Sequence, residues 1–410
     1  MIRRLPTGLA LGALAVLGAS AAAQDAWVIR AETIYTAAGD PIAGGHVRVE
    51  KGKIASVGSG PGSGANVLEA AAVTPGMIDL SARIGTTELS VEQSTETAAE
   101  LSVVEAIDFF SFRWDRELRS GVTAVLVSPY DNDVIGGLAA VVKTGGPPTL
   151  EARLVKEAAA LRAAIGSQPS AGNRTPRGAP PSSFYFRRPT TRMGVEWVLR
   201  KAYWDAIQAA ERGEADTDPH VRARHEVLRR TIRGELPVIV DAWATQDIRT
   251  AIFLKEEFQI PRLIVDGAAE AWREPELLAR AGLGVVLPPH VFTGRTREEA
   301  FFAWDCAATV EELGLPLALS AHGARDFGAR LDRQAGFAMR GGLPFAAALA
   351  SVTIHPARMV GVDDRLGSLE VGKDADVLLW NGTPFEATSA VIGVLLNGEL
   401  VLDPRAAAGQ

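Results

Sequence analysis

The residues of this sequence that could do chemistry are a few histidines and aspartates that follow short apolar runs. His290 and His322 each come directly after such a run, and Asp241 and Asp266 end two others. Neutral imidazoles and carboxylates bind divalent metals and transfer protons. If the runs are parallel strands, their carboxyl ends meet at one face and these side chains converge there. The alternative, that the two histidines are ordinary loop residues, stays open.

Lys143 and Cys306 are two further reactive side chains. Lys143 ends another apolar run, which fits an anion contact at a strand end or a structural lysine. Cys306 lies in an apolar segment typical of a buried helix, so we expect no nucleophile there. Since the chain has a single cysteine, no internal disulfide can form. The remaining histidines are predicted to be surface or structural residues: His46, His220, His225 and His355.

The elements that must position these groups change in type along the chain. Residues 73–361 alternate short apolar runs with helix-like stretches, which predicts a parallel α/β sheet of a length that suits a barrel. Residues 24–72 and 362–405 instead carry strand patterns separated by turn signals, Asn397-Gly398 being a strong hairpin signal. We expect these two end segments to pair as one composite β-sandwich domain into which the barrel is inserted.

Two segments fall outside this pattern. Residues 1–23 have an Arg3-Arg4 start, a short apolar stretch and a small-residue site at Ala21-Ala22-Ala23. They predict a secretory signal peptide and an exported, periplasmic or secreted protein that leaves the membrane after cleavage. An uncleaved membrane anchor is the alternative for these residues.

Residues 166–191 are rich in Pro, Gly, Ser and Arg and predict a long loop or lid.

Charge argues against a nucleic-acid partner. The formal net charge is −7, and the densest basic stretch, residues 222–233, has Glu226 within it and Glu235 just after it. Such mixed charge is typical of a solvated helix face.

Three stretches resemble the amidohydrolase superfamily, in particular its imidazolonepropionase-like branch. The first is Val73-Thr74-Pro75-Gly76-Met77-Ile78-Asp79, and the second runs from Gly121-Val122-Thr123-Ala124-Val125 to Gly136-Gly137. The third is Thr353-Ile354-His355-Pro356-Ala357-Arg358, followed by Gly367-Ser368-Leu369-Glu370-Val371-Gly372-Lys373-Asp374-Ala375-Asp376. The resemblance implies a (β/α)8 TIM-like barrel with a small composite β domain. It also implies metal-assisted hydrolysis of a C–N bond in an amide or cyclic amide.

The resemblance further implies metal ligands that this sequence does not carry. In the family the first barrel strand ends in His-x-His, the fifth and sixth strands each give a histidine, and the eighth gives an aspartate. Here Ser81 and Arg83 stand at the two histidine positions of the first strand, and the fifth strand ends in Asp241-Ala242-Trp243. Gly267 stands at the histidine position of the sixth strand, and Ala321 at the aspartate position of the eighth. A lysine bridges two metals in parts of the superfamily, and whether Lys143 matches it stays open.

These replacements lead to a degenerate family member as the main hypothesis. A guanidinium repels a divalent ion, so we expect Arg83 to replace the metal's charge and pair with Asp241. No cofactor is then expected. The barrel mouth would bind a small molecule, or the chain would form a homodimer or pair with an active homologue. The first alternative is an active hydrolase with a rebuilt site, using His290, His322, Asp241 and Asp266 with a metal such as Zn²⁺, or no metal. The second is a structural protein whose mouth is plugged by Trp243.

Overall fold

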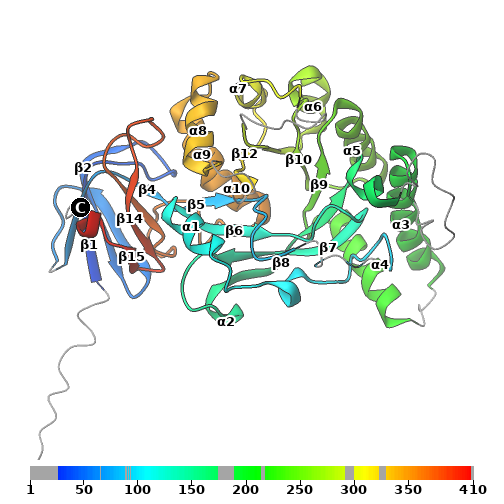
Figure 1. Cartoon of the computed structure of the whole chain (residues 1–410), viewed down its shortest axis with the longest axis horizontal. Coiled ribbons are helices and arrows are strands. Elements are labelled where there is room, and N and C mark those ends of the chain that lie inside the picture. The colour runs from blue at the N-terminus through cyan, green and yellow to red at the C-terminus, as the bar shows by residue number, and fades with distance from the viewer. Residues whose placement is uncertain are drawn as a thin grey trace, which may run out of the picture.

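The computed structural model describes residues 26–407, except 65, 88–89, 91, 93, 174–188, 214–217, 291–299 and 323–328. A seven-stranded sheet lies beside an eight-stranded barrel sheet covered by helices (Figure 1). The predicted signal peptide lies outside the described residues, as do residues 174–188 of the predicted loop. Among the helices of the described part, none has the length and apolar character needed to cross a membrane.

The seven-stranded sheet is built from both ends of the chain. Its strand order is β15-β14-β13-β4-β1-β2-β3, and antiparallel pairing of β4 with β13 joins the two end segments, as their patterns predict. Asn397 and Gly398 both have positive φ and connect β14 to β15, so the predicted hairpin is confirmed. The strands are β1 Ala26–Ile34, β2 Ile42–Glu50, β3 Lys53–Ser59, β4 Val67–Pro75, β13 Val377–Trp380, β14 Val391–Leu396 and β15 Glu399–Leu402.

The eight barrel strands follow chain order from β5 to β12 and form a nearly closed sheet. Apolar side chains such as Ile78, Leu126 and Ile239 fill its interior, as expected for a packed barrel. The strands are β5 Met77–Asp79, β6 Val122–Val127, β7 Ile135–Lys143, β8 Leu154–Ala164, β9 Val238–Ala242, β10 Leu263–Gly267, β11 Gly284–Leu287 and β12 Leu317–Leu319.

One strand breaks the regular parallel pattern that the resemblance implies. β7 pairs antiparallel with both β6 and β8, whereas β8 to β12 are parallel. A parallel crossover needs a dozen or more residues, usually a helix. The links at 128–134 and 144–153 are shorter, so the chain can only turn back at each end of β7.

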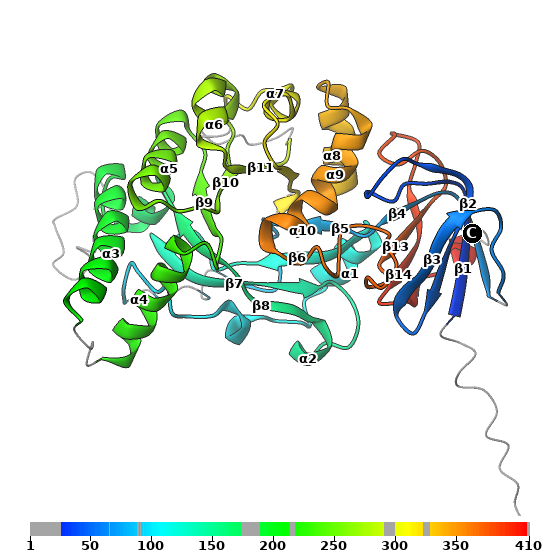
Figure 2. The same ribbon diagram turned by 180° about the vertical axis from the view of Figure 1, so that it is seen from behind.

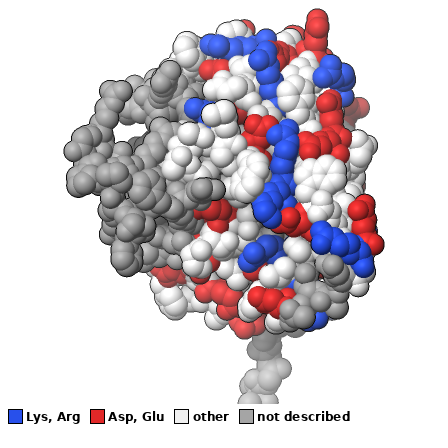
Figure 3. All heavy atoms as spheres, turned by 90° about the vertical axis from the view of Figure 1, so that its right-hand side faces the viewer, with Lys and Arg blue, Asp and Glu red and all other residues white. Residues whose placement is uncertain are grey.

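Helices cover the outside of the barrel, and α3 and α4 lie at the end farthest from the seven-stranded sheet (Figure 2). On that side basic and acidic side chains are interspersed (Figure 3), and Arg233 of the basic stretch pairs with Glu226 at 2.7 Å and Glu235 at 2.5 Å. The helices are α1 Arg113–Arg119, α2 Leu150–Arg153, α3 Arg192–Arg212, α4 Pro219–Ile232, α5 Thr245–Phe258, α6 Pro275–Ala281, α7 Cys306–Glu312, α8 Leu331–Arg340, α9 Phe345–Val352, α10 Ile354–Val360 and α11 Pro404–Ala407, with short 3-10 turns η2 Val103–Ala106, η3 Gln168–Asn173 and η5 Ala271–Arg273.

The chain passes from the sheet to the barrel at Gly76, between β4 and β5. A Cβ at this glycine would lie 2.0 Å from Thr123 Oγ1, so no other residue fits without moving β6. The Pro75-Gly76 motif therefore serves the join between the two sheets.

The motif at residues 367–376 also helps to join the barrel to the seven-stranded sheet. Lys143, which is 1% exposed, donates a hydrogen bond to Asp376 and lies 3.3 Å from Asp374. Asp374 also binds Lys53 at 2.6 Å and Arg365 at 2.9 Å. The prediction that Lys143 lies at the barrel mouth is corrected here. Because β7 runs antiparallel, Lys143 lies beside Ala124 near the amino end of β6, at the other end of the barrel.

Replacing Lys143 with methionine should destabilise the protein by about 3–5 kcal/mol, because Asp376 would be left buried without its cation. The matched control is Lys201→Met on α3, whose exposed pair with Asp205 is worth less than about 1 kcal/mol. Urea unfolding of both variants measures the difference. Equal costs for the two substitutions would show that the buried pair does not hold the barrel to the sheet.

Candidate functional site

The candidate site is a buried charge network at the carboxyl ends of the barrel strands. Its centre is Arg162, near the end of β8, which is 2% exposed. Arg162 Nε donates to Asp131 Oδ1 at 2.6 Å, and Nη1 donates to Asp266 Oδ2 at 2.6 Å. Nη2 lies 3.6 Å from Asp241 Oδ1. Three carboxylates from three parts of the chain therefore surround one guanidinium.

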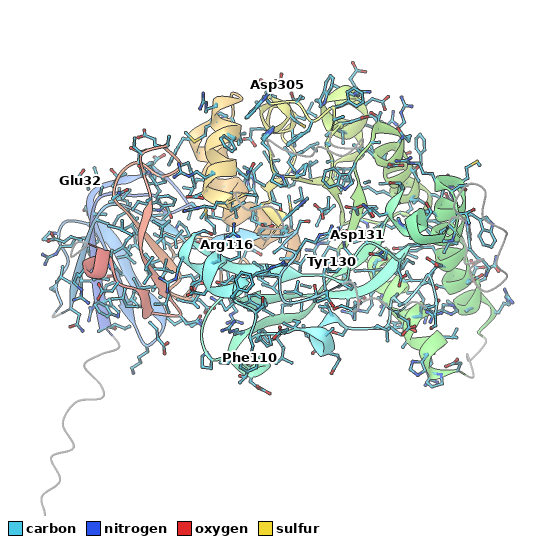
Figure 4. The ribbon with its side chains drawn as sticks, in the orientation of Figure 1. Glu32, Phe110, Arg116, Tyr130, Asp131 and Asp305 are labelled. Carbon is cyan, nitrogen blue, oxygen red and sulfur yellow. The ribbon has the colours of Figure 1, made fainter. Side chains whose placement is uncertain are left out.

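Arg83 adds a second guanidinium to this network. Its Nη2 donates to Asp131 Oδ2, so Asp131 joins the two arginines, and its guanidinium carbon lies 5.5 Å from the centre of the Tyr130 ring. Figure 4 shows Tyr130 and Asp131 in the loop that follows β6. The expected pair of Arg83 with Asp241 is corrected: the direct partner of Arg83 is Asp131, and the guanidinium beside Asp241 belongs to Arg162.

The two guanidinium groups affect the pKa values of the aspartates differently. Burial raises the pKa of Asp131, but the charges of Arg162 and Arg83 outweigh burial and hold it at about 2. Burial, together with the charge of Asp131, raises the pKa of Asp241 well above its ordinary value despite the same two arginines. Burial therefore favours the protonated form of Asp241 more than that of an ordinary aspartate.

Trp243 occupies the space that a side chain at position 267 would need. A Cβ on Gly267 would lie 2.6 Å from Trp243 Nε1, and Gly267 has φ +91°, a conformation that L-residues rarely adopt. Trp243 Nε1 donates to Asp241 Oδ1 at 2.9 Å, which fixes the indole in place. The tryptophan at 243 and a histidine at 267 are thus mutually exclusive in this backbone.

His322 lies against the same indole, edge to face, with ring centres 5.8 Å apart. Burial lowers the pKa of His322 to about 4, so its imidazole is neutral near pH 7. Asp241, Asp266, Trp243 and His322 are therefore brought together as the sequence predicts.

The backbone before His322 closes the barrel. Ser320 Oγ donates to Asp79 Oδ1 at 2.7 Å, and the Ala321 amide donates to Asp79 Oδ2 at 2.9 Å. Asp79 ends β5 and Ser320 follows β12, so this carboxyl group links the two edge strands of the barrel sheet. The position where the family's aspartate was expected, Ala321, contributes a backbone hydrogen bond instead.

His290, which is predicted at the mouth, packs among aromatic rings. Its ring stacks between Phe302 and Trp304, with centroid distances of 4.2 and 4.3 Å, and its backbone amide donates to Gln334. The His290 ring also meets Phe337 of α8 edge to face, with ring centres 6.5 Å apart. The described ring contacts of His290 are therefore with aromatic side chains.

Sequence reasoning missed Arg162 and Asp131, the two residues that link the network. Arg162 stands alone in an apolar strand, residues 158–165, and this isolated charge was a signal that could have been followed. Asp131 had only the weaker signal of an acidic turn after a buried strand.

These residues do not fit a divalent metal. The carboxylates that could bind one already face two permanent cations, which would repel it. Ser81, at another expected ligand position, donates its hydroxyl to Asp266 Oδ2 at 2.7 Å. Within the described ranges, no group of three or more histidine, cysteine, aspartate or glutamate residues is arranged to hold a metal ion.

Replacing Arg162 with methionine should cost about 3–5 kcal/mol of stability at pH 7, because three buried carboxyls lose their shared cation. The cost should shrink as the pH falls toward 4, since the orphaned carboxyls can then protonate. Arg119→Met, which removes an exposed pair with Asp115, is the control and should cost less than about 1 kcal/mol. Chemical unfolding at pH 7 and pH 4.5 measures both effects. A pH-independent cost near that of the control would contradict the charge network.

A second titratable group, Glu117 of α1, predicts a pH dependence of its own. It is 2% exposed, and burial, together with the charge of Asp79, raises its pKa to about 7. The folded state thus favours the neutral form, so stability falls as the pH rises from about 4.5 to 7. Glu117→Gln should match the parent near pH 5 and exceed its stability by about 2–4 kcal/mol at pH 8. Thermal unfolding beside the exposed control Glu312→Gln tests this, and an equal gain at both pH values would contradict it.

Comparisons with known proteins agree with this architecture. A sequence model of the amidohydrolase family matches residues 324–401. The crystal structure of an amidohydrolase from Thermotoga maritima superposes with a TM-score of 0.81 at 25% identity, covering 92% of this chain and 99% of that one.

Two curated relatives are also similar in sequence. Amidohydrolase tasK of Hapsidospora irregularis is 27% identical over 312 residues, which is 69% of this chain and 31% of that protein. An imidazolonepropionase of Syntrophobacter fumaroxidans is 34% identical over 121 residues, 28% of this chain and 27% of that one. The matches thus span less than a third of either relative's length. Family motifs, barrel topology and overall similarity agree, and all three relate this chain to the amidohydrolase family.

Proposed function

We propose that this chain is a catalytically degenerate amidohydrolase that keeps the barrel and has replaced the metal by an ion-pair network. Similarity to the amidohydrolase family supports a hydrolase ancestry, in which a divalent metal would activate water for the hydrolysis of a C–N bond. The loss of that chemistry, export directed by residues 1–23, and a role in binding a small molecule or a second protein chain belong to the proposal.

The observation that carries the proposal is the position of the Arg162 guanidinium between Asp131, Asp241 and Asp266. A guanidinium has no lone pair for a metal and keeps its proton at any physiological pH. It already supplies the positive charge that these carboxylates need. A divalent ion at the same place would have to displace a buried cation that is hydrogen-bonded to two of them.

The alternative is an active enzyme with a rebuilt metal site. His290 stacks on Phe302 and Trp304, and binding a metal would have to be compatible with that stack. Asp241 accepts a hydrogen bond from Trp243, and Asp266 Oδ2 accepts from Ser81 and Arg162. Binding a metal would break contacts of both carboxyls. The geometry therefore favours the degenerate member over the rebuilt site.

The purely structural alternative rests on Trp243, which lies over the end of β10. Trp243 and His322 are both only half-buried, whereas Asp241 and Asp266 beneath them are fully buried. The indole thus covers part of the mouth and leaves polar groups at its surface. That arrangement favours a mouth that binds a small molecule over a completely plugged one.

Metal content is the test. Protein purified without chelator or affinity tag should contain less than about a tenth of an equivalent of zinc, manganese, iron or nickel by elemental mass spectrometry. It should also hydrolyse amide and cyclic amide substrates no faster with added Zn²⁺ than with a chelator. The matched variant is Asp241→Asn, which should leave the metal content unchanged. About one equivalent of metal, lost in that variant, with hydrolysis that the chelator abolishes, would overturn the proposal.

A further inference from the structure

One oxygen of the charge network is buried without a partner. Asp266 is 1% exposed, and its Oδ2 accepts hydrogen bonds from Ser81 Oγ at 2.7 Å and Arg162 Nη1 at 2.6 Å. Its Oδ1 has no hydrogen-bond partner in the described part of the chain. A buried acceptor left unsatisfied costs about 1–3 kcal/mol, and more when it is charged. An atom in this state needs a donor that the protein itself does not supply.

The surroundings of Asp266 show where that donor would come from. Asp266 exerts the largest charge effect on the His322 ring, which in turn packs against Trp243. Both rings are only half-buried, whereas Asp266 is buried.

The charges facing Asp266 favour a cation. Arg162 and Arg83 are positive, Asp131, Asp241 and Asp79 are acidic, and the nearby imidazole of His322 is neutral. In the central network, three carboxyls share two guanidinium groups. A single further positive charge would match the number of carboxyls, and aromatic faces stabilise such a cation by about 0.5–2 kcal/mol. A water molecule could satisfy Oδ1 but would add no positive charge.

We propose that the barrel mouth binds a primary ammonium group, which donates a hydrogen bond to Asp266 Oδ1 beside the rings of Trp243 and His322. The ligand class is therefore a small organic amine in its protonated form. This inference rests on the proposed function, because it needs a mouth that holds no metal. It names the ligand chemistry that the degenerate site would recognise.

The first experiment compares three probes at constant ionic strength and pH 7: benzylammonium, the neutral benzyl alcohol, and benzyltrimethylammonium, which has the charge but no N–H donor. Calorimetric titration and the thermal midpoint are measured for each probe. Benzylammonium should bind saturably with a dissociation constant on the order of 1 mM and raise the midpoint. The other two probes should bind at least about 10-fold more weakly, which is 1.4 kcal/mol.

Two variants locate the site. Asp266→Asn replaces a carboxylate oxygen by an amide of the same shape and should weaken benzylammonium binding at least about 10-fold. Asp305→Asn, at an exposed aspartate (Figure 4), should leave binding unchanged. If Asp266→Asn does not fold, Trp243→Leu should weaken binding by removing the aromatic face.

Three results would overturn the inference: no saturable binding of benzylammonium, equal binding of benzyl alcohol, or full binding by both Asp266→Asn and Trp243→Leu. Metal analysis of the same preparation separates this failure from that of the proposed function. Metal-free protein that ignores benzylammonium contradicts only the amine site. Protein with about one equivalent of metal contradicts both the proposed degenerate function and the amine site.

Discussion

The buried guanidinium of Arg162 is the interaction on which the rest of the barrel mouth depends. It brings together carboxyls from the loop after β6 and from the ends of β9 and β10, and Arg83 joins through Asp131. A charge that is nearly inaccessible to water is tolerated only when opposite charges and hydrogen bonds surround it. Each carboxyl is in turn tolerated because the arginine is there. This mutual dependence fixes the side chains at the centre and limits what else the mouth can hold.

The replacements at the mouth form a set whose members depend on one another. Trp243 fits because position 267 has no side chain, and its indole holds the aspartate at 241. Ser81 is short enough to donate to Asp266 Oδ2, the same oxygen that accepts from Arg162. A metal ligand in place of one of these residues would clash with the next residue of the set or remove its partner. The side chains at these strand ends therefore pack and hydrogen-bond with one another without a metal ion.

The family motifs that survive in the chain are those that hold the fold together. Gly76 allows the chain to pass from one sheet to the other, and Asp374 and Asp376 hold Lys143 at the base of the barrel. Asp79 joins the first and last barrel strands through Ser320 and Ala321. These contacts concern the architecture and not the reaction. None of these contacts uses a side chain at Ser81, Arg83, Gly267 or Ala321, so the family resemblance does not depend on the side chains at the expected ligand positions.

The sequence by itself determined the features that depend on near neighbours. Apolar runs predicted several barrel strands, the Asn397-Gly398 pair predicted a hairpin, and the motif at residues 367–376 predicted the resemblance to the family, because strand patterns, turn residues and motifs are local. The tertiary structure alone decided which charges meet. Arg162 and Asp266 are 104 positions apart, and the partner of Arg83 could not be chosen among several acidic residues from spacing. Lys143 was misplaced because the direction of β7 depends on the length of two links and on pairing with both neighbours. Side chains so distant in sequence become partners only when the barrel closes, and closure is a property of all the strands together.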